Sequence, residues 1–385
     1  MELIKKRTFW LGKIEQLWKK TNLIWLYGVR RSGKTFLCRS VPEIEYFDCE
    51  LPRIRQYFSD PEELLKSLHG KKAVIDEIHR LDNPSEVLKI AADYFPNTKI
   101  IATGSSTLGT SIKFKDTLAG RKKDLWLLPM NWQDLNDFNR TEITYRLHRG
   151  GLPPFFLSKK MPESDFQEWL DAFWSKDIQE LFRLERRHSF QKFVELIFMQ
   201  SGGIFEATKF ARPCEVSRTT ISNYLKILEA TSVAYVLKPF SSYKTSEIIA
   251  APKVYAFDTG FVCYWRGWDK LRKDDMGILW EHFVLNEIYA NIQNHNLYYW
   301  RDKRGHEIDF ILTPRAGNPI AIETKWDSKG FEPTNLMAFR RQHSGVKNFV
   351  VSSDVIRPFS RKYHGLIVEF LNLPDFINKN LLGLK

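Results

Sequence analysis

Residues 28–35 read GVRRSGKT and directly follow the apolar run LIWLY at residues 23–27. The eight residues fit the pattern G-x-x-x-x-G-K-[ST], which forms a phosphate-binding loop only in the right structural context. An unbroken apolar run is typical of a parallel strand covered on both faces, and residues 34–39, KTFLCR, can open a helix. The order strand, glycine loop and helix therefore predicts a phosphate-binding loop here.

In this arrangement the backbone N–H groups of the loop and the N-terminus of the helix would face the phosphates. Lys34 would bridge the β- and γ-phosphates, and the Thr35 hydroxyl would hold Mg²⁺, so the predicted cofactors are ATP and Mg²⁺. The residues predicted to contact them are Gly28, Val29, Arg30, Arg31, Ser32, Gly33, Lys34, Thr35 and Phe36. The alternative is a tight turn that carries a surface lysine.

A second motif, KKAVIDEIHR, occupies residues 71–80 and contains a short apolar run that ends in Asp76 and Glu77. A carboxylate pair at the end of a buried strand is costly unless a cation or a reacting water uses it. We expect Asp76 to support the Mg²⁺ shell and Glu77 to polarise the attacking water. The alternative is that the pair caps the following helix.

A third strand, in KIIATGSS at residues 99–106, ends in polar side chains. Thr103 or Ser105 could lie beside the γ-phosphate and sense its loss. The alternative is a simple turn at Gly104.

The chain of 385 residues is long enough for two or three domains, and its pattern changes twice. Over residues 1–140 strands alternate with helices, which predicts a parallel sheet covered on both faces, as in P-loop NTPases. The strands are expected near residues 23–27, 43–48, 73–76, 99–103 and 124–128. The predicted fold class is therefore α/β, with an AAA+-like parallel sheet at the N-terminal end.

Residues 141–265 are mostly helical in pattern, and the glycine–proline cluster RGGLPPF at residues 149–155 predicts a boundary. Residues 206–240 have the pattern of a helix-turn-helix followed by a wing, with Ser217 as the N-cap of the second helix. Polar residues of that helix would enter the major groove of DNA. These residues are Arg218, Thr219, Ser222 and Asn223. The alternative is a module that serves only packing or protein contacts.

Residues 266–385 predict a third, α/β domain with a helix followed by strands. Glu281 lies in the helix, Asp309 in the second strand, and Glu323 and Lys325 in the third. Because strand residues alternate between faces, Glu323 and Lys325 point the same way, and Asp309 can meet them. Such a group can hold Mg²⁺ through Glu281, Asp309 and Glu323, and it can orient a water for phosphodiester cleavage. The alternative is an exposed, salt-bridged face.

The net charge of +12 suits a polyanionic partner, which predicts DNA binding. No run of eighteen apolar residues occurs, so no membrane partner is expected, and we predict a soluble cytoplasmic protein. The four cysteines are far apart in sequence and have neither metal-ligand spacing nor the pattern of a disulfide framework.

GVRRSGKT, AVIDEIHR, IIATGSS and DTLAGR together resemble the bacterial and archaeal AAA-type ATPases that carry a DUF4143 C-terminal region. RGGLPPF resembles the start of that region. The run from EHFVLNEI to PIAIETKW resembles its restriction-endonuclease-like end, the PD-(D/E)XK fold, although HEID at residues 306–309 lacks the proline of that motif. This fold does not by itself imply cleavage.

The resemblance implies an AAA+-related core and a homo-oligomer, such as a ring, as the expected assembly. It also matches Arg121, in LAGR, to a family arginine that acts as an arginine finger or phosphate sensor. Arg121 could equally bind a phosphate in its own chain or a carboxylate at an interface.

Two functions remain in view. The first is an Mg²⁺-dependent ATPase that acts on DNA, with a nuclease-like C-terminal site. The alternative is a nucleotide-switched binding or regulatory protein whose C-terminal domains only hold a partner.

Overall fold

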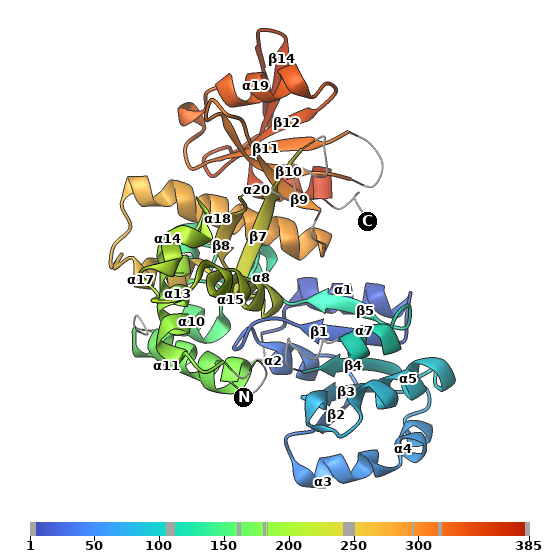
Figure 1. Ribbon diagram of the computed structural model, residues 1–385. Coiled ribbons are helices and arrows are strands. Elements are labelled where there is room, and N and C mark those ends of the chain that lie inside the picture. Colours follow the sequence, from blue (N-terminus) through green and yellow to red (C-terminus); the bar gives the residue numbers. More distant parts are fainter. Residues whose placement is uncertain are drawn as a thin grey trace. The chain divides into compact units, whose positions relative to one another are not determined.

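The computed structural model describes residues 5–104, 112–159, 163–179, 182, 184–241, 251–294, 296–314 and 318–381 (Figure 1). The chain forms two compact units, and it passes between them several times. Unit 1 comprises residues 1–141, 152–187 and 230–232, and unit 2 comprises residues 142–151, 188–229 and 233–385.

Unit 1 contains a five-stranded, fully parallel sheet in the order β2-β3-β4-β1-β5. The strands are β1 (Leu23–Tyr27), β2 (Ile44–Asp48), β3 (Lys72–Asp76), β4 (Lys99–Thr103) and β5 (Lys123–Trp126). Their predicted positions are confirmed to within two residues. β1 and β3 are almost wholly buried because helices cover both faces, as their apolar runs predicted (Figure 1). The α/β fold class, a P-loop NTPase sheet with further helical segments and a second sheet, is confirmed.

Two helices of unit 1, α4 (Pro61–Ser67) and α8 (Trp132–Asp137), begin at side-chain caps. Asp60 accepts the Glu63 N–H at 3.0 Å, and Asn131 and Asp134 form a reciprocal capping box. The helices are α1 (Thr8–Trp18), α2 (Lys34–Arg39), α3 (Pro52–Arg55), α4 (Pro61–Ser67), α5 (Pro84–Tyr94), α7 (Ile112–Thr117), α8 (Trp132–Asp137), α10 (Pro153–Leu157) and α11 (Glu163–Ala172). Short 3₁₀ turns lie at Gln56–Ser59 and Ile78–Arg80, and the π-helix η3 spans Phe173–Gln179.

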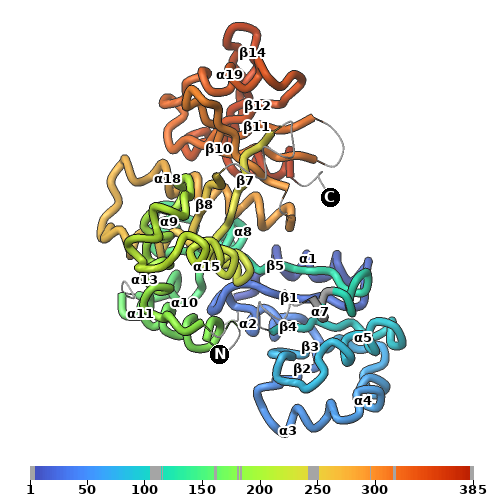
Figure 2. Tube along the Cα trace, in the orientation of Figure 1, coloured from blue at the N-terminus to red at the C-terminus, as the bar shows by residue number. Residues whose placement is uncertain are grey.

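Unit 2 is built on a nine-stranded mixed sheet in the order β13-β14-β12-β11-β10-β9-β7-β8-β6 (Figure 2). The strands are β6 (Gly203–Ile204), β7 (Ala234–Pro239), β8 (Lys253–Ala256), β9 (Leu297–Arg301), β10 (Glu307–Leu312), β11 (Ile320–Lys325), β12 (Lys347–Ser352), β13 (Phe359–Tyr363) and β14 (Leu366–Leu371). β7 pairs in parallel with β9 through Lys238 and Tyr298. That pairing makes one sheet of segments that the sequence assigned to different domains.

Helix α18 (Lys273–Ile292) is the longest helix described in unit 2, and 14 of its 20 residues are buried. The Trp280 Nε1–H of α18 donates to the Val351 carbonyl of β12 at 3.0 Å. The helices are α9 (Ile143–Arg149), α13 (Arg187–Met199), α14 (Ala207–Ala211), α15 (Arg218–Ala230), α17 (Thr259–Trp265), α18 (Lys273–Ile292), α19 (Thr334–Gln342) and α20 (Leu373–Phe376), with short turns at Ser328–Gly330 and Ile377–Leu381. Ser217 caps α15 as predicted, because its Oγ accepts the Thr220 N–H at 3.1 Å.

The glycines of RGGLPPF are required by close packing inside unit 2. Gly150 has φ +82°, and a Cβ there would lie 2.0 Å from Oδ1 of Asp258. The buried Asp258 carboxylate accepts the N–H groups of Gly151 and Gly260. The chain then leaves unit 2, since Leu152 and the prolines that follow belong to unit 1.

Among the helices of the described residues, none is both long and apolar enough to span a membrane.

Candidate functional sites

The loop after β1 takes a conformation that requires its two glycines. Gly28 has φ +155°, and a Cβ there would lie only 2.3 Å from the carbonyl oxygen of Leu127. Gly33 has φ +92° and stands at the N-cap of α2. A side chain at either position would be strained, so the loop keeps the tight path that brings backbone N–H groups to a phosphate.

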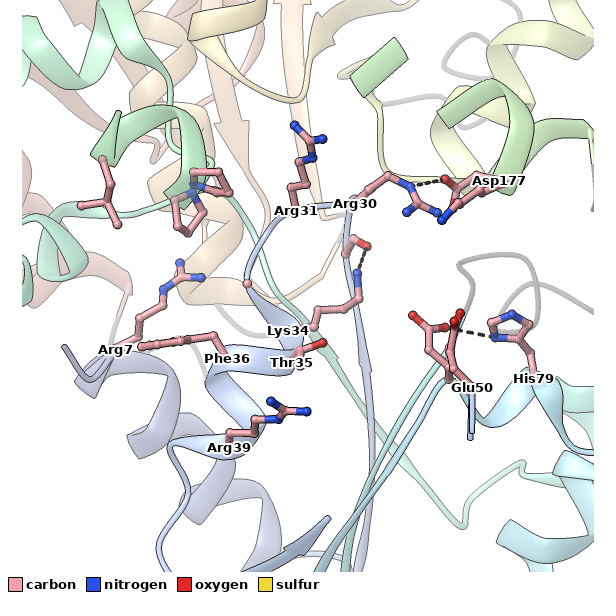
Figure 3. Close-up of a pocket in the computed structure, with 18 of the residues that line it drawn as sticks. Arg7, Arg30, Arg31, Lys34, Thr35, Phe36, Arg39, Glu50, His79 and Asp177 are labelled. Carbon is pink, nitrogen blue, oxygen red and sulfur yellow. Dashed lines mark hydrogen bonds and ion pairs between the residues drawn. The ribbon is translucent and has the colours of Figure 1, made fainter. Parts of the chain in front are cut away.

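A cavity of about 660 Å³ lies at this loop, and all of its lining residues belong to unit 1 (Figure 3). Seven of the nine residues predicted to contact the nucleotide line it. These are Gly28, Arg30, Arg31, Gly33, Lys34, Thr35 and Phe36. Val29 and Ser32 are buried and do not line the cavity.

Lys34 is half-buried and lines the cavity. Its Nζ donates to the carbonyl oxygens of Gly28 at 2.9 Å and Val29 at 3.2 Å (Figure 3). Burial lowers the pKa of Lys34, and the negative charges of Glu77, Asp177 and Asp76 oppose that shift. A phosphate in the cavity would favour the charged form of Lys34, so this residue fits a polyphosphate ligand.

Asp76 and Thr35 meet as the sequence predicted for a Mg²⁺ site. Oγ1 of Thr35 donates to Oδ2 of Asp76 at 3.1 Å. Oγ1 of Thr103, on the neighbouring strand β4, and the hydroxyl of Tyr46 also donate to this carboxylate. A carboxylate and a hydroxyl beside a phosphate loop are the ligands that Mg²⁺ takes in such sites, so the residues present fit this ion.

Glu77 lies in a strained backbone conformation, with φ +53°, which is uncommon for a residue other than glycine. Its Oε2 is 3.2 Å from Nδ1 of His79, and its N–H donates to Oγ1 of Thr103 at 3.2 Å. Burial acts to raise the pKa of Glu77, but the hydrogen bond and charge of His79, with Lys34 and Arg30, hold that pKa below its usual range. Glu77 therefore faces the cavity as a carboxylate that can accept a proton.

The cavity also uses residues that the sequence did not reveal. Asp177, in the π-helix η3, accepts the Nε–H of Arg30 at 2.9 Å (Figure 3). Arg7, which is almost fully buried, donates to the carbonyl oxygen of Ser32 at 2.9 Å and to the Asp134 carboxylate. Their partners are more than twenty residues away in sequence, so no local pattern signals them.

Two further residues predicted to contact the nucleotide, Arg121 and Ser105, are also not among the described residues that line the cavity. Arg121 lies just before the start of the edge strand β5, whereas the glycine loop follows the end of β1. Its Nε lies 2.7 Å from Oδ1 of Asp93. It does not line the cavity. Ser105 lies outside the described residues.

Unit 2 brings the predicted carboxylates and lysine together at the middle of its sheet. Phe310 pairs with Ile322, a register that places Asp309 beside Glu323. Oδ2 of Asp309 accepts the Thr324 N–H at 2.7 Å and its hydroxyl at 2.8 Å. Nζ of Lys325 lies 3.0 Å from Oε2 of Glu323.

Glu281, on α18, joins this group through partners that the sequence did not reveal. Nζ of Lys253, on β8, lies 2.8 Å from Oε1 of Glu281 and 2.8 Å from Oε1 of Glu307. The Tyr255 hydroxyl also donates to Glu281. Lys253 and Tyr255 are two residues apart on one strand, so they reach the same face.

Burial and the nearby negative charge of Asp309 raise the pKa of Glu281 and raise the pKa of Glu323 to about 8. Oε1 of Glu323 is buried without a hydrogen-bond partner in the described part of the chain. A cation at this oxygen would satisfy it, so Asp309 and Glu323 fit a hard divalent ion. Within the same described residues, no group of three or more His, Cys, Asp and Glu side chains is arranged to hold a metal.

The predicted recognition helix α15 turns its apolar side inward. Ile221, Tyr224, Leu225 and Leu228 are buried, whereas Arg218, Thr219 and Asn223 are exposed and Ser222 is half-buried. The polar residues predicted to meet DNA therefore lie mainly on the open side of the helix.

Sequence comparison now defines the class. Residues 20–136 match the model of an AAA domain, residues 140–272 a domain of unknown function, DUF8612, and residues 276–376 the domain of unknown function DUF4143. The chain thus combines an AAA-type P-loop ATPase domain with a DUF4143 C-terminal region. The expectation that RGGLPPF begins the DUF4143 region is wrong, because residues 149–155 fall within the DUF8612 match.

An uncharacterized protein of Mycobacterium tuberculosis is 27% identical over 328 residues, which cover 82% of this chain and 72% of the relative. An uncharacterized protein of Methanocaldococcus jannaschii is 25% identical over 329 residues, with 74% and 71% covered. A Walker-type ATPase of Pyrococcus abyssi, a solved structure, has a TM-score of 0.44 at 16% identity and covers 66% of this chain and 94% of its own.

Proposed function

We propose that the protein binds ATP with Mg²⁺ in the unit 1 cavity, hydrolyses it, and uses the cycle to act on DNA. The meeting of Thr35, Asp76 and Glu77 beside the glycine loop is the observation that carries this proposal. The AAA-domain match over the same residues supports it.

Each of these residues has a distinct role in the proposed reaction. Lys34 and the loop N–H groups bind the phosphates, and Thr35 and Asp76 hold the metal. Mg²⁺, when bound, would neutralise the charge that develops on the β- and γ-phosphates. Glu77 is held ionised and orients the attacking water, while the hydroxyl of Thr103 ties Asp76 and Glu77 to the next strand.

The proposed DNA contact is supported by the charge of +12 and by the order of elements in unit 2. Helix α13, strand β6, helices α14 and α15, and strands β7 and β8 follow one another, and both β6 and β7 pair antiparallel with β8. This is the order of a winged helix, with α15 in the position of the recognition helix.

A homo-oligomer is part of the same proposal. Arg121 is engaged with Asp93 outside the cavity of its own chain, so its action on a phosphate would require a second copy of the chain.

The proposed domains remain residues 1–140, 141–265 and 266–385.

Steady-state ATP hydrolysis with Mg²⁺, with and without duplex, single-stranded and branched DNA, tests the proposal. Glu77→Gln should bind ATP normally and lose turnover by at least a hundredfold, and Lys34→Ala serves as the blank. Glu50→Gln is the matched control, because Glu50 also lines the cavity but pairs at its rim with Arg80. Hydrolysis by Glu77→Gln at the parent rate would refute the assignment.

A nuclease activity of the PD-(D/E)XK type is the second candidate. Oε1 of Glu323, which has no hydrogen-bond partner within the described part of the chain, favours it. Asp309 and Glu323 would hold the ion, and Lys325 would stabilise charge on the scissile phosphate. We expect Mg²⁺- or Mn²⁺-dependent nicking that is lost in Asp309→Ala. If all DNA substrates stay intact and DNA leaves ATP turnover unchanged, the nucleotide-switched binding protein becomes the better account.

A further inference from the structure

Lys253 is a buried cation in the unit 2 cluster, with a side chain only 6% exposed. A lysine is rarely buried unless it is paired. Here Nζ lies 2.8 Å from one oxygen each of Glu281 and Glu307, so it bridges two carboxylates. The Tyr255 hydroxyl donates to the same oxygen of Glu281 and fixes that side chain further.

The direct ion pairs of the cluster fall into two groups. Glu281 and Glu307 face Lys253, and Nε of Arg301 lies 3.9 Å from Oε2 of Glu307, so two negative charges meet two positive ones.

Asp309 and Glu323 have one direct ion pair among the described residues, between Glu323 and the ammonium of Lys325, while Lys253 faces Asp309 at longer range. Asp309 and Glu323 are therefore the carboxyl groups of the cluster with the fewest direct ion pairs, and burial with the charge of Asp309 raises the pKa of Glu323.

The hydrogen bonds lead to the same division. Oδ2 of Asp309 is occupied by Thr324, and Oε2 of Glu323 by Lys325. Oε1 of Glu323 has no hydrogen-bond partner among the described residues, although the Asn335 side chain acts with Lys325 to lower the pKa of this carboxyl. Oε1 of Glu281, in contrast, accepts two donors.

We propose that Lys253 acts as a built-in cation in this cluster, so that the site binds one divalent ion, on Asp309 and Glu323, and not two. The inference rests on the metal site of the second candidate function, and it removes Glu281 from the ligands that the sequence predicted.

In two-metal sites the ions stand about 3.5–4 Å apart and share carboxylates. A second ion here would have to use Glu281 and Glu307, where the Lys253 ammonium already stands and would repel it. A single ion bound by two carboxylates retains several water ligands, which is the usual coordination of Mg²⁺ in proteins. Lys253 thus positions Glu281 and sets the number of ions, without touching the reacting phosphate.

The test is a titration of the full-length protein with Mn²⁺, without nucleotide, following free Mn²⁺ by electron paramagnetic resonance. The ions bound at the cluster are counted as the difference between the parent and Asp309→Asn, and we expect one. In Lys253→Met the same difference should rise to two. Lys238→Met, a change at an exposed lysine of the adjoining strand β7, should leave it at one.

A second measurement on the parent protein avoids any folding defect of Lys253→Met. At saturation, bound Mn²⁺ should give the spectrum of isolated ions, whereas two ions a few ångströms apart would give an exchange-coupled spectrum. A coupled spectrum, or one ion in both the parent and a folded Lys253→Met, overturns the inference but leaves the metal site standing. No ion lost in Asp309→Asn overturns both, while ATP hydrolysis in unit 1 is judged separately.

Discussion

Replacement of Arg7 by methionine should destabilise unit 1 far more than the loss of an ordinary ion pair. The Arg7 guanidinium and the Asp134 carboxylate are 1% and 0% exposed, and they are 2.6 Å apart. Arg7 also donates to the Ser32 carbonyl of the phosphate loop. Arg7→Met would leave Asp134 buried with only the N–H groups of Trp10 and Asn131.

The expected cost follows from these contacts. Breaking a buried ion pair from one side costs about 3–5 kcal/mol. An unpaired carbonyl at Ser32 adds about 1 kcal/mol, and the two N–H groups that remain on Asp134 recover a similar amount. We therefore expect Arg7→Met to lower the free energy of unfolding by about 4 kcal/mol. Asp134→Asn in the same chain should restore about half of that loss, because it removes the stranded charge.

Urea unfolding followed by tryptophan fluorescence measures these changes. The control is Lys72→Met, which breaks the exposed pair of Lys72 and Glu15, 3.0 Å apart, and should cost less than about 1 kcal/mol. ATP affinity should fall in Arg7→Met and not in Lys72→Met, since only Arg7 contacts the loop. A loss in Arg7→Met no larger than in Lys72→Met would refute the reasoning.

Three further outcomes are expected. Gly28→Ala should lower the free energy of unfolding by roughly 2–4 kcal/mol and weaken ATP binding, because the added Cβ meets a backbone carbonyl. Gly12→Ala is the control: apart from neighbours along the helix, no atom of the described residues lies within 4 Å of the added Cβ, so this change should stabilise α1 by up to about 1 kcal/mol. Equal urea midpoints for the two variants would contradict the prediction. Gly150→Ala should lower the melting temperature, because its Cβ overlaps the Asp258 carboxylate. Burial lowers the pKa of His282 to about 3. Below pH 6.5 the unfolded chain therefore binds a proton that the folded chain does not, and the free energy of unfolding should fall by about 1.4 kcal/mol per pH unit. Melting curves of His282→Gln should lack this pH dependence.

The sequence predicted the position of the candidate site residues where those residues lie close together along the chain. Gly28 to Thr35 connect β1 to α2, so the motif and the strand and helix patterns on either side of it together predicted the phosphate loop. Asp76 and Glu77 ended a run that could only be a buried strand. In a parallel sheet the ends of neighbouring strands share an edge, and that rule was enough to bring Asp76 to Thr35.

The sequence was silent where a contact depends on how distant segments pack. Lys253, on strand β8, contacts Glu281, on helix α18, and Tyr46, on β2, contacts Asp76, at the end of β3. Asp177 enters the cavity because a π-helical turn shifts its side chain, and no apolar periodicity encodes that turn.

The β13–β14 hairpin was also missed, because β13, Phe359–Tyr363, is an exposed edge strand without a buried face.

The interleaving of the two units has a consequence for how this chain could be shortened or recombined. A fragment that ended near residue 140 would keep the glycine loop but lose Pro153 and Asp177, which line the cavity from the segment beyond the first excursion into unit 2. That excursion ends at Gly150 and Gly151, whose packing partner Asp258 lies more than a hundred residues downstream. A gene fusion that exchanged only the N-terminal third would therefore transfer an incomplete pocket, because residues from the segment 153–177 complete its lining.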